Sequence, residues 1–306
     1  MSSKIKRLIV GGVSAVALMA TTLSAQATTY INIASAANFS ATLADIWNDF
    51  HAYYLTNYGL DYGYTVTTGP TATLKADIIA GSPQFDFFFS ADQATPVDLY
   101  NNHRSLVDAS PFEYAEGSLV LWSGPLNTVN ISGGLPSPLT TNFVIAAPNA
   151  APYGYAAMQV LNDAPWSLGL TTSTTYPSGY VYTATSIGNT YNAVLAGTYP
   201  YGFVAKSQVC RTVSGTPTWN SYSSTTYARE YYAEGTSSSN AVPPNPISSG
   251  SQPYDHITQY AIQIANSSRT TAQSTELTNF VNWLNGSTPG STAHSVILSY
   301  CYRWAL

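Results

Sequence analysis

Three short segments of the chain place small residues, hydroxyl groups and backbone N–H groups where a helix is expected to begin. The first N–H groups of a helix have no partner within it, and the helix start carries a partial positive charge that attracts anions. Several such starts meeting in one cleft would bind a small oxyanion without any lysine or arginine. The segments are Ala36-Ala37-Asn38-Phe39-Ser40, Gly69-Pro70-Thr71-Ala72-Thr73 and Ala150-Ala151-Pro152-Tyr153-Gly154.

Apolar spacing predicts the elements that position these segments. Alternating or continuous apolar runs predict strands, and apolar residues three and four apart predict helices. The first part of the chain gives strands over residues 30–34, 64–68 and 85–90, with helices over 40–54 and 73–80 between them. We expect Asn38 or Ser40 to cap the first helix. This β-α-β-α-β order predicts parallel strands with a ligand at their C-terminal ends.

A second unit follows in the middle of the chain. Residues 118–122, 143–147 and 201–205 predict strands, residues 152–161 predict a helix, and Thr185 or Ser186 can cap another helix that runs to Leu195. Residues 212–252 contain Ser, Thr, Tyr, Pro and Gly with little periodicity, which indicates a long surface insertion, partly hairpin. A strand over 260–265, a helix over 275–284 and a last helix or strand over 296–302 complete the chain.

The N-terminus predicts export. Three basic residues precede an apolar stretch and an Ala-Gln-Ala exit, which is typical of a secretory signal peptide over residues 1–27 rather than of a membrane anchor. Cleavage leaves seven basic and fifteen acidic residues, a net charge of −8, which disfavours a nucleic-acid partner. Only 8% of the residues are charged, so we also expect stability in an acidic medium.

The two cysteines, Cys210 and Cys301, lie in an exported chain. An oxidising compartment favours a disulfide between them over two buried free thiols. Such a bond would close a long loop and hold the C-terminus in place.

Other chemistry is not favoured by the sequence. Four histidines, at positions 51, 103, 256 and 294, lack metal-ligand spacing, so no cation site is predicted. No Gly-x-Ser-x-Gly turn indicates a serine hydrolase. Asp86 and Asp92 flank a strand end, and we assign them structural roles because carboxylates would repel a bound oxyanion.

An ordered set of motifs resembles the periplasmic molybdate-binding proteins of ABC importers, over most of the chain except the insertion. Smaller matches are Thr71-Ala72-Thr73-Leu74, Leu119-Val120-Leu121-Trp122 and Ala151-Pro152-Tyr153-Gly154. Longer matches are Ile33-Ala34-Ser35-Ala36-Ala37-Asn38-Phe39 and Asp86-Phe87-Phe88-Phe89-Ser90-Ala91-Asp92-Gln93. The most specific elements are Phe89-Ser90-Ala91-Asp92-Gln93 and Gly202-Phe203-Val204-Ala205-Lys206-Ser207-Gln208.

The resemblance implies an α/β, two-lobed periplasmic-binding-protein fold of type II, each lobe a doubly wound mixed sheet flanked by helices. Lobe I would comprise residues 28–117 plus 257–306, and lobe II residues 118–256, including the insertion. The ligand would lie between the lobes.

The resemblance also implies the oxyanion donors, residue by residue. They are Asn38, where many relatives have Ser; Thr71, through hydroxyl and N–H; Tyr153, through N–H; and the N–H near Ile187. The tyrosine hydroxyl of some relatives falls on Ala205 and is absent here, and Tyr201 or Tyr153 could replace it.

We therefore expect an extracytoplasmic solute-binding protein, periplasmic or secreted, and not an enzyme. It would be a monomer that captures molybdate or tungstate, with no cofactor and no metal cation, and delivers it to an ABC permease. Two alternatives stay open. One is a binder of sulfate or another small ligand in the same fold, and the other is a secreted carbohydrate-binding or surface-interaction protein.

Overall fold

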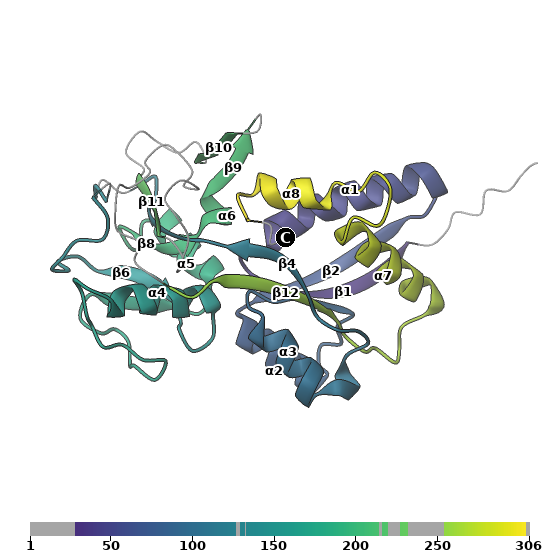
Figure 1. The fold of residues 1–306 in the computed structure, drawn as a ribbon, viewed down its shortest axis with the longest axis horizontal. Helices are drawn as coiled ribbons and strands as arrows, with labels where there is room; N and C mark the ends of the chain where they lie inside the picture. Colours follow the sequence, from purple (N-terminus) through teal and green to yellow (C-terminus); the bar gives the residue numbers. More distant parts are fainter. Residues whose placement is uncertain are drawn as a thin grey trace, which may run out of the picture.

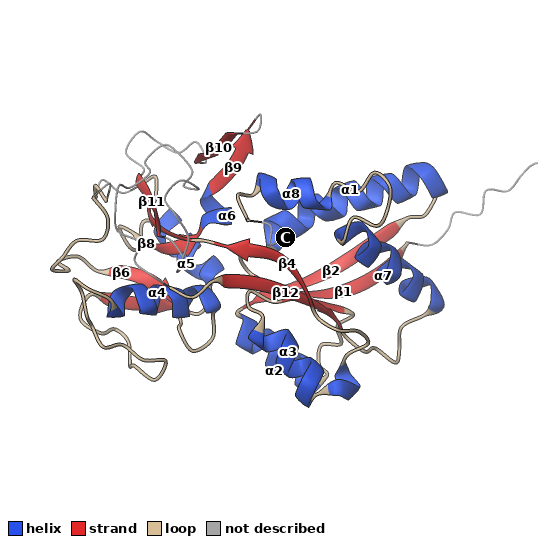
Figure 2. Ribbon diagram, viewed as in Figure 1, coloured by secondary structure: helices blue, strands red, loops and turns tan. Residues whose placement is uncertain are grey.

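Two five-stranded sheets, each flanked by helices, organise the part of the chain that the structure describes (Figures 1 and 2). The structure is a computed structural model, and it describes residues 28–126, 129–131, 133–213, 216–219, 227–231 and 254–303. We call the part built on the first sheet lobe I and the part built on the second sheet lobe II. The predicted signal peptide, residues 1–27, lies outside the described residues.

The lobe I sheet has the strand order β2-β1-β3-β12-β4. Strand β1 runs parallel to β2 and β3, and β12 runs antiparallel to β3 and β4. The strands are β1 (Thr29–Ala36), β2 (Tyr62–Gly69), β3 (Phe87–Phe89), β4 (Phe112–Gly117) and β12 (Ile257–Gln263). The sheet is therefore mixed, because β12 returns late in the sequence and inserts between β3 and β4.

Helices cover both faces of this sheet (Figure 1). On one face lie α1 (Ser40–Tyr58), α7 (Thr271–Leu284) and α8 (Ala293–Ser299), over an aromatic core that includes Phe50 and Phe280. On the other lie α2 (Thr71–Ala80) and α3 (Ala94–Asn102), followed by the short 3-10 helix η1 (Arg104–Leu106). The three consecutive phenylalanines of β3 alternate between the two cores, as the pleat of a strand requires.

The lobe II sheet has the order β11-β5-β8-β6-β7. Its strands are β5 (Leu119–Ser123), β6 (Phe143–Ala146), β7 (Val181–Ala184), β8 (Gly202–Ala205) and β11 (Tyr227–Tyr231). Helix α4 (Pro152–Asn162) packs on one face and α5 (Ile187–Leu195) mostly on the other, because alternate residues of β5, β6 and β8 point to opposite cores.

The chain passes between the lobes where β4 leads into β5 and again where β12 begins. At the second passage the Leu119 N–H donates to the Tyr254 hydroxyl at 2.9 Å. Short helix α6 (Lys206–Val209) and the antiparallel pair β9 (Cys210–Val213) and β10 (Thr216–Trp219) follow β8.

The fold class predicted from the sequence is confirmed, with corrections to several elements. Helices α2 and α7 begin two and four residues earlier than expected, and α7 begins there because Thr270 and Gln273 form a capping box. The last element is a helix, α8, and α3, β4 and β7 were not expected. Within the predicted insertion the described residues form the antiparallel pair β9 and β10 and the edge strand β11. Residues 214–215, 220–226 and 232–252 lie outside the described part.

Candidate functional site

The four predicted donors all lie where a parallel strand ends and a helix begins. Asn38 follows β1, and Thr71 is the first residue of α2 after β2. Tyr153 is in the first turn of α4, which comes after β6, and Ile187 is the first residue of α5, after β7. Because β1 is paired in parallel with β2, and β6 with β7, each lobe presents two helix starts at one edge of its sheet.

The helix starts of the two lobes meet in pairs. The Ala72 N–H at the start of α2 donates to the Ala150 carbonyl, just before α4, at 3.2 Å. At the start of α5, a Cβ built on Gly188 would lie 3.1 Å from the Ala37 side chain before α1. The structure therefore brings the start of α2 against α4 and the start of α1 against α5.

Asn38 is buried, and neither Asn38 nor Ser40 caps α1, so the expected cap is wrong. The Ser40 hydroxyl donates to the Ala37 carbonyl instead. The residue before the helix is Phe39, and the Asn38 amide turns toward β12, away from the first turn. Its Nδ2 donates to Gln259 Oε1 at 2.9 Å and to the Tyr302 hydroxyl at 3.0 Å. Its Oδ1 is buried without a hydrogen-bond partner among the described residues.

Thr71 is 3% exposed and keeps a hydroxyl proton to offer. Its Oγ1 accepts from the Ala91 N–H at 3.2 Å, so the O–H itself remains a donor. The preceding Pro70 has extended backbone and Thr71 opens the helix, which agrees with the turn chemistry of Gly69-Pro70.

Tyr153 is positioned by the close approach of α4 to the end of β6. A Cβ on the next residue, Gly154, would lie 2.3 Å from the Ala146 carbonyl oxygen, so glycine allows the first turn to sit directly on the strand. The Tyr153 side chain is 1% exposed, and its hydroxyl accepts from Gln259 Nε2 at 3.0 Å. Its backbone N–H lies in the first turn, where helices leave donors without intrahelical partners.

Ile187 is buried at the start of α5, where Ser186 forms the cap by accepting from the Asn189 N–H. This arrangement leaves the N–H groups of Ile187 and Gly188 at the helix start. The two tyrosines proposed to replace the donor missing at Ala205 both have other contacts. The Tyr201 hydroxyl donates to the Thr141 carbonyl at 3.3 Å, and the Tyr153 hydroxyl contacts Gln259.

Gln259 is a residue that the sequence reasoning missed. It is 0% exposed, lies on β12 beside a register shift, and joins the two lobes. Its Oε1 is 2.9 Å from both Asn38 Nδ2 and the Tyr114 hydroxyl, and its Nε2 donates to Tyr153. The available signal was a polar Gln259 with apolar Ile257 and Ala261 two positions away on either side.

The hydroxyls around Gln259 are neutral donors. Burial raises the pKa of Tyr114 and Tyr153 well above the ordinary value and that of Tyr302 to about 12. Like an oxyanion site built on helix starts, this cluster contains no charged side chain.

A cleft of about 480 Å³ opens between the lobes beside Thr71 and the start of α4. It is lined by the α2 start, the segment before α3, residues 148–152, α4 and the start of β12. Burial raises the pKa of Asp92 in this cleft, although hydrogen bonds from Thr95 and Ser90 oppose the shift. Asp255 also lines the cleft, so a dianion is disfavoured beside these two carboxylates.

Asp86 and Asp92 have the structural contacts expected of them. Asp86 is 0% exposed and accepts from the Asn32 N–H, Asn266 Nδ2 and Arg269 Nε at 2.8–2.9 Å. Asp92 accepts from the Thr95 N–H at 2.8 Å at the start of α3.

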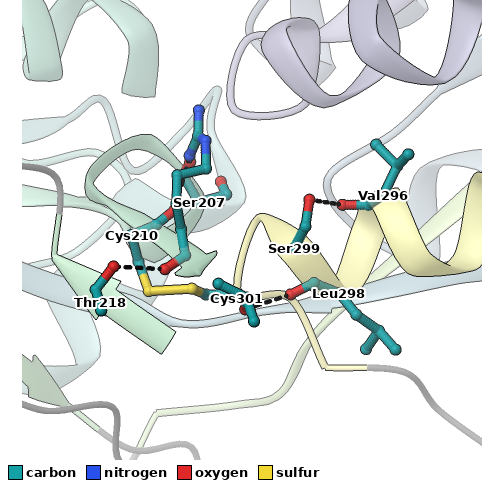
Figure 3. The surroundings of a disulfide bond; sticks show 9 residues. Ser207, Cys210, Thr218, Val296, Leu298, Ser299 and Cys301 are labelled. Atoms are coloured by element: carbon teal, nitrogen blue, oxygen red, sulfur yellow. Dashed lines mark hydrogen bonds between the residues drawn. A yellow bond between two sulfur atoms is a disulfide. The ribbon is translucent and has the colours of Figure 1, made fainter. Parts of the chain in front are cut away.

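The predicted disulfide is present between Cys210 and Cys301, 91 residues apart (Figure 3). Cys210 begins β9, directly after α6, and Cys301 follows α8, so the bond joins lobe II to the C-terminal segment on lobe I. Nearby, the Arg211 guanidinium lies 3.5 Å from the centre of the Tyr300 ring. Thr218 Oγ1 also donates to the Arg211 carbonyl at 3.0 Å.

The described residues contain neither a cluster of metal ligands nor a helix suited to cross a membrane. No group of three or more His, Cys, Asp and Glu side chains there has an arrangement that could hold a metal ion. None of the helices in the described part combines the length and apolar character that a membrane crossing needs.

Comparison with known proteins gives the family. Residues 31–288 match the family described as bacterial extracellular solute-binding protein. The molybdate-binding protein ModA of Azotobacter vinelandii is 36% identical over 195 residues, which cover 62% of this chain and 71% of that protein. The molybdate-binding protein ModA of Rhodobacter capsulatus is 37% identical over 149 residues, which cover 48% of this chain and 56% of that protein.

Solved structures agree on the fold. The periplasmic molybdate-binding protein of Azotobacter vinelandii superposes with a TM-score of 0.63 at 24% identity, covering 90% of this chain and all of that one. The substrate-binding domain of a molybdenum ABC transporter protein from Clostridium difficile gives a TM-score of 0.52 at 18% identity, covering 92% and 100%. The chain belongs to the bacterial extracellular solute-binding proteins, a family of binding proteins and not of enzymes, and within it is similar to ModA.

Proposed function

We propose that this protein captures a tetrahedral oxyanion, molybdate or tungstate, outside the cytoplasm and delivers it to an ABC permease. The single observation that carries the proposal is the pairwise meeting of four helix starts from two lobes. Relatives named as molybdate-binding proteins support the choice of ligand. The donors would be the side chain or N–H of Asn38, the hydroxyl and N–H of Thr71, and the N–H groups of Tyr153 and Ile187.

Uncharged hydrogen-bond donors suit a fully ionised anion. The whole chain has a net charge of −5, so long-range attraction cannot concentrate an anion, and local dipoles must bind it. Donors without a spare acceptor disfavour a protonated anion such as hydrogen phosphate, which needs a partner for its own proton. Sulfate has the same charge as molybdate but shorter bonds, so the size of the closed site must separate the two.

The remaining parts of the proposal concern the cycle. The two lobes open and close around the anion by hinge motion where β4 leads into β5 and where β12 begins. We propose an exported monomer, with residues 1–27 as the cleaved signal peptide, whose closed form is recognised by the permease.

Calorimetry with molybdate, tungstate, sulfate and phosphate tests the ligand. We expect micromolar or tighter binding of molybdate and tungstate with no response to sulfate. No heat from any of the four anions would refute the proposal. Binding of sulfate alone would mean that the protein binds an oxyanion but that the ligand is sulfate, not molybdate or tungstate.

Substitution of Thr71 tests the site. Thr71→Val removes a buried hydroxyl donor to an anion, worth roughly 1.5–3 kcal/mol, so molybdate should bind at least several-fold more weakly. Thr73→Val is the matched control, because Thr73 lies on the exposed side of the same helix. Equal affinities for the two variants and the unmodified protein would mean that the anion binds elsewhere.

A further inference from the structure

One hydrogen-bond cluster in the structure is incompletely paired, and it surrounds Gln259. Asn38 Oδ1 is buried without a partner among the described residues, although Asn38 is only 3% exposed. The Tyr114 hydroxyl has one proton but lies within reach of two acceptors, the Ser90 carbonyl at 3.0 Å and Gln259 Oε1 at 2.9 Å. With the amides in this orientation, one buried acceptor stays unpaired and one contact stays unused.

Rotating both terminal amides by 180° exchanges their nitrogens and oxygens at the same positions. Gln259 Nε2 then donates to Asn38 Oδ1 and to the Tyr114 hydroxyl, which leaves the Tyr114 proton for Ser90. The Tyr153 hydroxyl becomes the donor to Gln259 Oε1. The Tyr302 hydroxyl donates its one proton to the Asn38 carbonyl at 3.0 Å and would then face Asn38 Oδ1 as a second acceptor. Every contact distance around Gln259 is then used by a donor and an acceptor.

Besides this conflict at Tyr302, the exchanged arrangement has a larger demand. It places the Asn38 Nδ2 protons where the unpaired oxygen stood, in a buried position that needs an acceptor. Burial of an unpaired amide costs free energy, so this arrangement is stable only when an acceptor such as an oxyanion oxygen is bound. The Asn38 amide cannot rotate without the Gln259 amide, because the amide oxygen of one residue must face the amide nitrogen of the other.

We propose that Gln259 is a positioning residue for Asn38, and that oxyanion binding exchanges the two amides together so that Asn38 Nδ2 donates to the anion. This inference rests on the oxyanion-binding function proposed above. Tyr153 brings lobe II into the same network, because its hydroxyl accepts in one orientation and donates in the other. Closure of the lobes and the donor state of Asn38 are thereby linked through one side chain.

A double-mutant cycle with molybdate as the probe tests the inference. Calorimetry on the full chain compares the unmodified protein with Gln259→Met, Asn38→Ala and the double variant. Asn38→Ala keeps the backbone N–H and removes the amide, and we expect it to lower the affinity for molybdate about tenfold. Gln259→Met should lower the affinity for molybdate by a similar factor. The double variant should bind molybdate no more weakly than Asn38→Ala alone.

The outcomes separate this inference from the function on which it rests. If Gln259→Met weakens binding by the same factor with and without the Asn38 side chain, Gln259 is merely structural and the inference is overturned. If Asn38→Ala binds normally while Thr71→Val does not, the inference is also overturned and the oxyanion site stands. If the unmodified protein binds no molybdate, the proposed function itself fails.

Two further variants guard against misfolding. Tyr153→Phe removes only the hydroxyl that orients Gln259. It should lower the affinity for molybdate several-fold in the otherwise unmodified protein and have no effect on affinity in the Asn38→Ala variant. Equal weakening in both backgrounds would count against the inference. Gln263→Met, at the end of the same strand and outside the network, is the matched control and should leave the affinity unchanged.

Discussion

Glu276 should make this protein more stable in acid than at neutral pH. It lies on α7 and is 0% exposed, and neither carboxylate oxygen has a hydrogen-bond partner among the described residues. Burial raises the pKa of Glu276 from 4.5 to about 8, and the nearby carboxylates of Asp86 and Asp61 act in the same direction. The Thr29 side chain and the Gly63 N–H lie near the carboxylate, outside hydrogen-bond geometry, and they oppose the shift without overcoming it.

The change in the free energy of unfolding follows from the difference between the ordinary and the raised pKa of Glu276. At about 1.4 kcal/mol per pH unit, the interval between 4.5 and about 8 sets a ceiling of about 5 kcal/mol. Solvent penetration and local relaxation lower this ceiling, and we expect about 2–3 kcal/mol. Because the folded-state pKa is raised, this stability is fully present below pH 4.5 and is lost as the pH rises toward 8.

Urea unfolding between pH 4.5 and 8 measures the effect. Glu276→Gln removes the titrating group, so its free energy of unfolding should vary less with pH and exceed that of the unmodified protein at pH 8. Asp77→Asn, at a partly exposed position on α2, is the control for the loss of one carboxylate. Parallel pH profiles for the Glu276→Gln variant and the unmodified protein would refute the reasoning.

Two other substitutions have clear expected results. Gly117→Ala would place a Cβ 1.9 Å from the Tyr153 hydroxyl and 2.6 Å from Gln259 Nε2. We expect a loss of about 1–3 kcal/mol of stability and weaker molybdate binding, measured by thermal unfolding and calorimetry. Gly133→Ala, with nothing within 4 Å, is the control, and matching behaviour of the two would contradict the packing argument. Replacing Cys210 and Cys301 together by Ser opens a link between residues 91 apart, so the free energy of unfolding should fall by about 2–4 kcal/mol. An unchanged melting temperature would show that the bond does not constrain the unfolded chain.

Local sequence predicted the type and approximate position of most of the longer elements. Gly69-Pro70-Thr71 and Ala151-Pro152-Tyr153 each carry a proline where a helix can start, and helices begin at Thr71 and at Pro152. The apolar run at 87–89 could only be a buried strand. These features depend on residues close together in the chain, so the sequence alone predicted them, and the family motifs supplied the fold.

Which side chains meet was decided by the tertiary structure. Asn38 was expected as a cap, but β12 arrives between β3 and β4 from 221 residues away and draws its amide to Gln259. The contacts of Thr71 with Ala91 and of Ala37 with Gly188 likewise depend on strand order and on how the lobes close. A one-dimensional pattern carries the donors and their helices, whereas the geometry of their convergence comes from long-range pairing, which no local spacing encodes.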